Sequence, residues 1–140
     1  MKALIMNIAT RAALALSILS TLAPLAANAA PASLSSGAFV SAAHATSGTA
    51  TIYKLDDGSR ILRLANFSTS NGPKVHVILA DHAISGNDVE DAKSVDLGDL
   101  KGNTGNQNYV IPASVNLDDV KSVAIYCERF HVNFGAASLK

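Results

Sequence analysis

Beyond the first third of the chain, apolar residues recur at every second position in short runs, and each run stops at a cluster of glycine, asparagine, aspartate or proline. In residues 59–67 (SRILRLANF), Leu62 and Leu64 fall on one face while Ile61 and Arg63 fall on the other. This period of two is typical of β-strands, because successive side chains of a strand point to opposite faces. Nothing in this part of the sequence has the pattern of a long amphipathic helix. We therefore expect an all-β fold, an antiparallel β-sandwich or small barrel.

The same pattern divides the chain into strands and turns. Strands are expected over residues 48–55, 59–67, 74–80, 94–97, 106–111 and, with an interruption, 122–134. Asp57-Gly58 predicts a hairpin between the first two, because Asp-Gly suits a tight turn. Residues 81–93 are polar and contain Gly86-Asn87, so they are expected to form a long surface loop with at most a helical turn. Residues 116–120 can form a single turn.

The last apolar run changes phase at its middle. Even spacing places Val123, Ile125 and Cys127 on one face, and it places Phe130, Val132 and Phe134 on the other. The change predicts a bulge or sharp turn at residues 127–129. A strand buried on both faces is the alternative. In either case Cys127 is expected at an irregular or buried point.

The first 29 residues have a different character. Lys2 and Arg11 give a positive start, residues 12–27 are almost purely apolar, and Ala27-Asn28-Ala29 has small residues at both positions that a signal peptidase recognises. This pattern predicts a signal peptide, residues 1–29, that is cleaved after Ala29 and leaves no stable membrane anchor. The mature chain is then periplasmic or secreted, with a flexible lead-in over residues 30–36 and a single small domain over residues 37–140.

Charge and motifs exclude several functions. Lys2 and Arg11 are two of the eleven basic residues, so the rest of the chain carries nine basic residues against eleven acidic ones, all scattered. This balance does not suit a nucleic-acid partner. No Gly-x-Ser-x-Gly motif is present, and the carboxylate pairs at residues 56–57 and 118–119 fall in turns. A turnover enzyme is therefore not expected.

Cys127 is the only cysteine. An internal disulfide is impossible, so the domain must be stabilised by packing. Two interpretations remain open. Cys127 is a redox thiol or cofactor ligand, in which case a nearby cation such as Arg129 or protonated His131 would favour the thiolate. Alternatively, Cys127 is a small buried apolar residue of a core strand.

The four histidines are His44, His76, His82 and His131. None of them pairs at the close spacing of a recognisable metal site, so no metal site is predicted, and His76 and His82 are interpreted as structural or solvated. No Cys-x-x-Cys-His motif occurs, which excludes covalent c-type haem. Both methionines lie within the first 29 residues. A non-covalent haem could therefore use only His/His, His/Cys or a single ligand.

Several short motifs occur together in one order. They are residues 37–39 (GAF), 44–50 (HATSGTA), 62–67 (LRLANF), 70–73 (SNGP), 75–77 (VHV), 97–102 (LGDLKG), 105–109 (GNQNY), 111–112 (IP), 123–127 (VAIYC) and 129–130 (RF). This combination resembles the DM-thirteen domain family, whose domains accompany DOMON domains and are described as electron-transfer domains. The resemblance spans about residues 37–139.

The resemblance implies a β-sandwich of the DOMON or immunoglobulin-like kind, outside the cytoplasm. It also implies a redox role through one characteristic cysteine, which matches Cys127, as a bare thiol or as the ligand of a prosthetic group such as haem. His131 and His44 are the further candidate cofactor-binding residues. The chain carries the domain without the modules that often accompany it, so any redox partner is expected to be another extracytoplasmic protein.

The leading hypothesis is an exported carrier or accessory domain for electron transfer, centred on Cys127. The alternative is a non-catalytic binding module in which Cys127 packs the core and residues 81–93 and 100–105 contact the partner. A third hypothesis is thiol-based sensing of oxidants, which requires a partly exposed thiolate.

Overall fold

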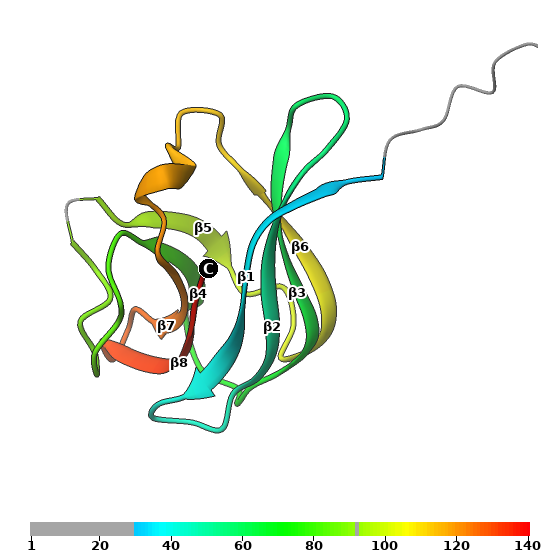
Figure 1. Ribbon diagram of the computed structural model, residues 1–140. Helices are drawn as coiled ribbons and strands as arrows, with labels where there is room; N and C mark the ends of the chain where they lie inside the picture. Colours follow the sequence, from blue (N-terminus) through cyan, green and yellow to red (C-terminus); the bar gives the residue numbers. More distant parts are fainter. Residues whose placement is uncertain (1–29, 92) are drawn as a thin grey trace, which may run out of the picture.

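The computed structural model describes residues 30–91 and 93–140. The expected signal peptide, residues 1–29, lies outside the described residues. The described part forms eight antiparallel strands in one sheet with the order β5-β4-β7-β8-β1-β2-β3-β6 (Figure 1). The strands are β1 (Ala32–Ser41), β2 (Ser47–Lys54), β3 (Arg60–Ser68), β4 (Val75–Ala80), β5 (Val95–Asp99), β6 (Thr104–Ile111), β7 (Ser122–Cys127) and β8 (Val132–Ser138).

Strand β1 joins two halves of this sheet. Its residues 32–38 pair with β2, whereas Phe39, Val40 and Ser41 pair with β8. The half formed by β1, β2, β3 and β6 faces the half formed by β4, β5, β7 and β8 (Figure 1). The predicted all-β, antiparallel class is confirmed, and the two layers of the expected sandwich are parts of one nearly closed sheet.

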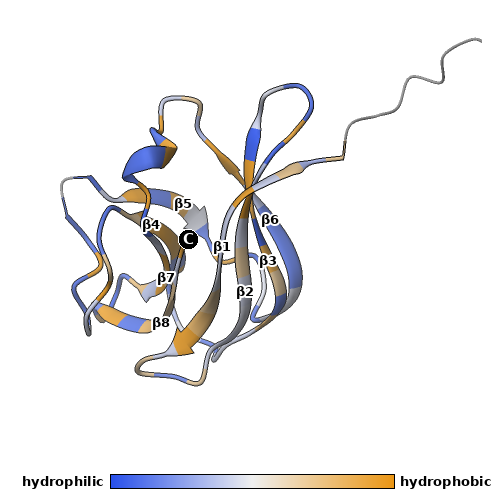
Figure 2. Cartoon of the chain, in the orientation of Figure 1, coloured by the Kyte–Doolittle hydropathy of each residue, from blue (hydrophilic) through white to orange (hydrophobic). Residues whose placement is uncertain are grey.

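The core lies between the two halves. Alternating side chains from seven of the strands meet there, including Ile52, Leu62, Leu64, Val77, Ile125 and Phe134. In Figure 2 hydrophobic and hydrophilic residues follow one another along the strands, as expected for strands with one face buried and the other exposed to solvent. Burial of these apolar side chains is the main stabilising contribution available to a domain without a disulfide.

The prediction of a flexible lead-in over residues 30–36 is wrong from Ala32 onward, because strand β1 starts at Ala32. Ser33, Ser35 and Ser36 pair with β2, and the main chain of Ser36 exchanges two hydrogen bonds with Lys140, each of 3.0 Å. These side chains have little β propensity. Pairing is made by backbone groups, which any of these residues supplies.

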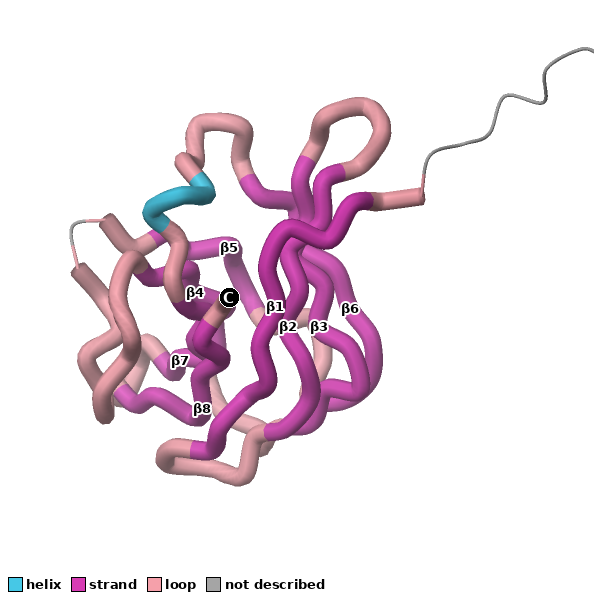
Figure 3. Tube along the Cα trace, in the orientation of Figure 1, coloured by secondary structure: helices cyan, strands magenta, loops and turns pink. Residues whose placement is uncertain are grey.

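The expected turns form where the sequence predicted them. Residues 55–59 connect β2 and β3, and Asp57 Oδ1 accepts a hydrogen bond from the Ser59 N–H at 2.8 Å. The turn expected at residues 116–120 is the 3₁₀ helix η1 (Leu117–Asp119), which is the one helical segment of the described residues (Figure 3). Asn116 caps it by accepting a hydrogen bond from the Asp118 N–H at 3.2 Å.

Both explanations offered for the C-terminal phase change hold. Strand β7 ends at Cys127, and a turn over residues 128–131 leads into β8. Every residue of β7 is also buried. The second face of β7 is covered by residues 81–91, whose Val89 is fully buried against Ile78, Ala124 and Tyr126.

No helix of the described residues is long and apolar enough to cross a membrane.

Candidate functional site

Cys127 is the last residue of β7, and its side chain belongs to the main core. It is 1 % exposed and lies in the same apolar cluster as Val75 and Phe134. The thiol donates a hydrogen bond to the carbonyl oxygen of Pro73 at 3.1 Å. Cys127 was expected at an irregular or buried point, and the structure places it, buried, at the end of a strand. The hydrogen bond occupies the one proton that the thiol can donate.

His131 does not lie beside the Cys127 thiol. Its Nδ1 is 3.2 Å from the hydroxyl of Tyr126, which belongs to the second apolar cluster, on the other face of β7. Adjacent residues of a strand point to opposite faces, so Tyr126 and Cys127 are separated by the sheet. His131 has a φ of 52°, a left-handed conformation that reverses the chain before β8.

His44 lies in the connection between β1 and β2 and is exposed. Its ring packs edge-on against Phe134, with 4.2 Å between the ring centroids. Its main-chain N–H donates to the Phe134 carbonyl at 3.3 Å. His44 therefore covers the outer side of a core aromatic ring.

These positions do not fit a haem held by Cys127 together with His131 or His44. An axial ligand must present its donor atom to the cofactor. The sulfur of Cys127 is enclosed by the core and directed at Pro73, and His131 is held on the opposite face of β7.

A group of polar side chains that sequence reasoning did not bring together surrounds His76 on β4. Its Nδ1 lies 2.7 Å from Asp96 Oδ2 and 3.4 Å from Glu128 Oε1, and its Nε2 lies 2.9 Å from Asp99 Oδ1. We call these four residues the His76 cluster. One nitrogen and two carboxylate oxygens are thus gathered around a single point.

A bulge in β5 places both aspartates on the same face. Residues three apart in a regular strand point to opposite faces, but Asp99 pairs with His76 while Asp96 pairs with Ile78, which requires a shift of register. Gly98 makes the shift at a φ of 100°, which residues with a Cβ rarely adopt. Its N–H also donates to Asp96 Oδ1 at 2.7 Å.

The charges of the His76 cluster change one another's protonation. Burial acts to lower the pKa of His76, but the hydrogen bond and charge of Asp96 and the charges of Glu128 and Asp99 outweigh it, so the pKa is raised. Burial, and then a hydrogen bond shared with Asp96, raise the pKa of Glu128. Two neighbouring carboxylates repel each other when both are charged, and this repulsion favours the protonated form of one of them.

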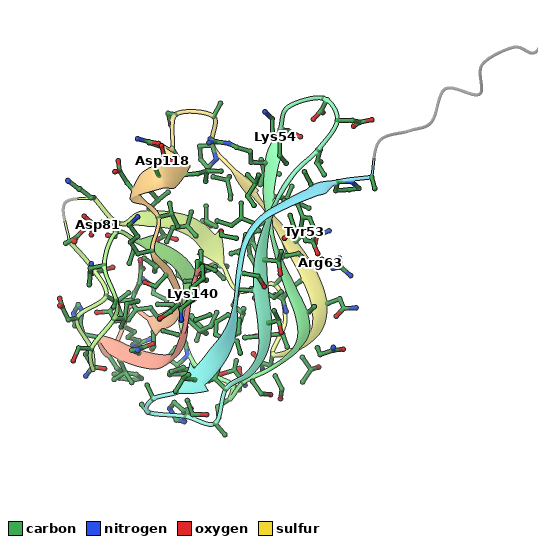
Figure 4. The ribbon with its side chains drawn as sticks, viewed as in Figure 1. Tyr53, Lys54, Arg63, Asp81, Asp118 and Lys140 are labelled. Atoms are coloured by element: carbon green, nitrogen blue, oxygen red, sulfur yellow. The ribbon has the colours of Figure 1, made fainter. Side chains whose placement is uncertain are left out.

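A second cluster lies in the segment after β4. His82 Nδ1 is 3.0 Å from Asp81 Oδ1 and 3.3 Å from Asp91 Oδ2, and its Nε2 is 2.9 Å from the carbonyl oxygen of Asp88. Figure 4 labels Asp81 on the β4 side of the molecule, across the view from Arg63. The hydrogen bond to Asp81, followed by that to the Asp88 carbonyl, raises the pKa of His82 to about 9.

The His76 cluster escaped prediction because its members come from separate segments. His76 lies on β4, Asp96 and Asp99 on β5, and Glu128 in the turn between β7 and β8. The sequence did contain one sign of this site. Asp96 and Asp99 lie three positions apart on either side of Gly98, which does not fit the alternation of a regular strand. It becomes informative only when β5 is known to pair with β4.

Comparison with protein families gives one result. Searches of curated proteins and of solved structures returned no match. The family model described as "Electron transfer DM13" matches residues 38–139, most of the chain and all of its strands from the middle of β1 onward. The chain therefore belongs to the electron transfer DM13 family.

Proposed function

We propose that this protein is an exported accessory domain with a redox role in electron transfer, and that the role centres on Cys127. Membership of an electron-transfer family supports the general role. The observation that carries the proposal is the placement of the sole cysteine. The Cys127 thiol donates a hydrogen bond to the Pro73 carbonyl. Cys127 also lies directly before the turn 128–131, in which Arg129, Phe130 and His131 are exposed.

The geometry limits how such a thiol reacts. A side chain that is 1 % exposed, with its proton donated to a main-chain carbonyl, meets an external oxidant only when the covering backbone moves. The Pro73 carbonyl belongs to the segment 69–74 between β3 and β4, so we infer that this segment is the one that opens. We infer that the domain exchanges electrons with a protein partner outside the cytoplasm and does not turn over a substrate.

Thiol chemistry on the folded protein tests this role. The purified protein is treated with a thiol reagent under native conditions, and the rate of modification is compared with the rate of global unfolding. We expect modification to be faster than unfolding, because only the segment 69–74 has to open. We expect Cys127→Ser to remain folded and to lose electron exchange with the partner.

Modification only at the rate of global unfolding, together with unchanged electron exchange in Cys127→Ser, would show that Cys127 is not the redox group. An optical spectrum of the same sample tests the cofactor version of the hypothesis. A Soret band that survives in Cys127→Ser would place a prosthetic group elsewhere in the protein.

The burial of Cys127 favours a second candidate function, a non-catalytic binding module. Its thiol has apolar neighbours and a satisfied hydrogen bond, as a packing residue requires. Partner contacts would then lie on segments 81–93 and 100–105. In that case Cys127→Ala changes stability without changing affinity for the partner, and substitutions in these two segments change affinity.

A further inference from the structure

We propose that His76, Asp96 and Glu128 bind a divalent first-row transition-metal ion, and that Asp99 orients the imidazole for this task. The site is independent of any role of Cys127. Cys127 lies in the main core, whereas His76 is partly exposed and its strand neighbours Val75 and Val77 point into that core.

The donor atoms converge on one point. His76 Nδ1, a carboxylate oxygen of Asp96 and one of Glu128 all lie within 4.8 Å of one another. One imidazole nitrogen with two carboxylate oxygens is a donor set that Zn²⁺ and Cu²⁺ accept, and water completes the coordination in an open site.

The second ring nitrogen of His76 also has a hydrogen-bond partner. Nε2 lies 2.9 Å from Asp99 Oδ1, so the imidazole donates an N–H there. Nδ1 lies 2.7 Å from Asp96 Oδ2, and an ion that displaces the Nδ1 proton would meet the lone pair of this nitrogen between Asp96 and Glu128. A histidine that binds a metal almost always donates its other N–H to a carboxylate or a carbonyl, which fixes the tautomer. Asp99 provides this partner.

The charge of the His76 cluster is not balanced by the protein. Even a protonated His76 offsets only one of the three carboxylates around it. Among the residues described by the structure, no lysine or arginine forms an ion pair with Asp96, Asp99 or Glu128. A divalent cation in place of the imidazolium proton would balance the two inner carboxylates.

Hydrogen bonds position the Asp96 side chain and the main chain of Glu128 before any ion arrives. The Gly98 N–H holds Asp96 Oδ1 and leaves Oδ2 directed at His76. The main-chain N–H of Glu128 donates to the Lys74 carbonyl at 3.0 Å. The side chains remain accessible, because Glu128 also lines a shallow surface depression of about 420 Å³ with Lys74 and Arg129. Rigid elements and open access together suit exchangeable binding.

The donor chemistry selects the class of ion. Ca²⁺ and Mg²⁺ prefer all-oxygen sites, so the imidazole disfavours them relative to borderline ions. Among first-row ions, affinity for nitrogen and oxygen donors rises toward Cu²⁺. We therefore use Zn²⁺ and Cu²⁺, each alone, as the probes.

The test is a titration of the full chain, freed of metal with a chelator, in which calorimetry measures Zn²⁺ affinity. We expect one ion per chain. Glu128→Gln, which keeps the size of the side chain, should weaken binding at least tenfold, and His76→Gln should abolish it. Asp99→Asn should weaken binding about tenfold, as is typical of a residue that orients a ligand.

His82→Gln is the matched control, because the His82 cluster has similar donors on another segment. We expect it to bind Zn²⁺ as the unaltered chain does. Electron paramagnetic resonance of the Cu²⁺ complex should show coupling to one imidazole nitrogen, which His76→Gln removes and His82→Gln leaves. Zn²⁺ should also raise the melting temperature of every variant that binds it.

The proposal is overturned if the chain shows no saturable Zn²⁺ or Cu²⁺ binding, or if His82→Gln, and not His76→Gln, removes the bound ion. Equal affinity in Glu128→Gln and the unaltered chain also overturns it, provided that circular dichroism shows both to be folded.

Discussion

The thiol of Cys127 donates a hydrogen bond to the carbonyl oxygen of Pro73 at 3.1 Å, across the 54 positions that separate them in the sequence. This contact ties the end of β7 to the segment that precedes β4. The main chains of the same region also meet, because Val75 and Cys127 are paired residues of β4 and β7. Cys127 therefore has a structural role whatever its chemistry.

The first prediction concerns the stability of Cys127 variants. Cys127→Ala should lower the free energy of unfolding by about 1–2 kcal/mol, because it removes the sulfur from a filled core and leaves the Pro73 carbonyl without its donor. Urea unfolding followed by circular dichroism measures the change. Val75→Ala, at the paired position of β4, is the control for a side chain that only packs. A Cys127→Ala protein more stable than the unaltered chain would contradict this account, because it would show that Cys127 is held at a cost to folding.

The second prediction concerns the segment between β4 and β5. Val89 is fully buried on the outer face of β7, and Asn133 holds the same segment by donating from Nδ2 to the Gly86 carbonyl at 3.0 Å. Val89→Ala should cost about 1–2 kcal/mol and should speed hydrogen exchange at residues 122–127, because it loosens their cover. Glu90→Ala, at the exposed neighbouring position, should change neither quantity. Unchanged exchange in Val89→Ala would mean that the segment does not protect β7.

How much of the fold the sequence predicted depends on the kind of residue. Strands β2, β3 and β4 were predicted within a residue or two, because their β-branched and leucine side chains alternate. Strand β1 and the end of β8 were missed, because serine, alanine and glycine, which make up most of these residues, carry no such signal. Gly135 in β8 is required by packing instead: a Cβ there would lie 2.6 Å from the Cβ of Thr46.

The candidate functional residues also differ in how far the sequence predicted their positions. An irregular or buried point at Cys127 followed from a local phase change, which is visible in the sequence. The His76 cluster was not predicted, because it depends on the pairing of β4 with β5 and on a bulge at Gly98. The burial of Val89 was also missed, since a single apolar residue in a polar segment gives no periodic pattern. Contacts made by tertiary pairing leave no trace in local spacing.

The third prediction concerns pH. The pKa of His82 is raised from 6.5 to about 9, chiefly by its hydrogen bond to Asp81. A raised pKa in the folded state means that the stabilisation is complete below pH 6.5 and is lost as the pH rises through about 9. The difference in melting temperature between the unaltered chain and His82→Gln, measured with a chelator present, should therefore shrink between pH 6.5 and 10. A difference that stays constant over this range would show that His82 is not held as a cation.

The fourth prediction tests whether the start of the domain is a strand. A Cβ at Gly37 would lie 1.8 Å from the carbonyl oxygen of Ser138, so Gly37→Ala must push β1 away from the C-terminal segment. That movement would strain the paired hydrogen bonds between Ser36 and Lys140. We expect a loss of about 1–3 kcal/mol in the free energy of unfolding, as overpacking of a tight contact typically costs. Ala38→Ser, at the next and exposed position, is the control and should be nearly neutral. If β1 were only loosely attached at Gly37, Gly37→Ala would be as stable as the unaltered chain, because a mobile segment moves aside without cost.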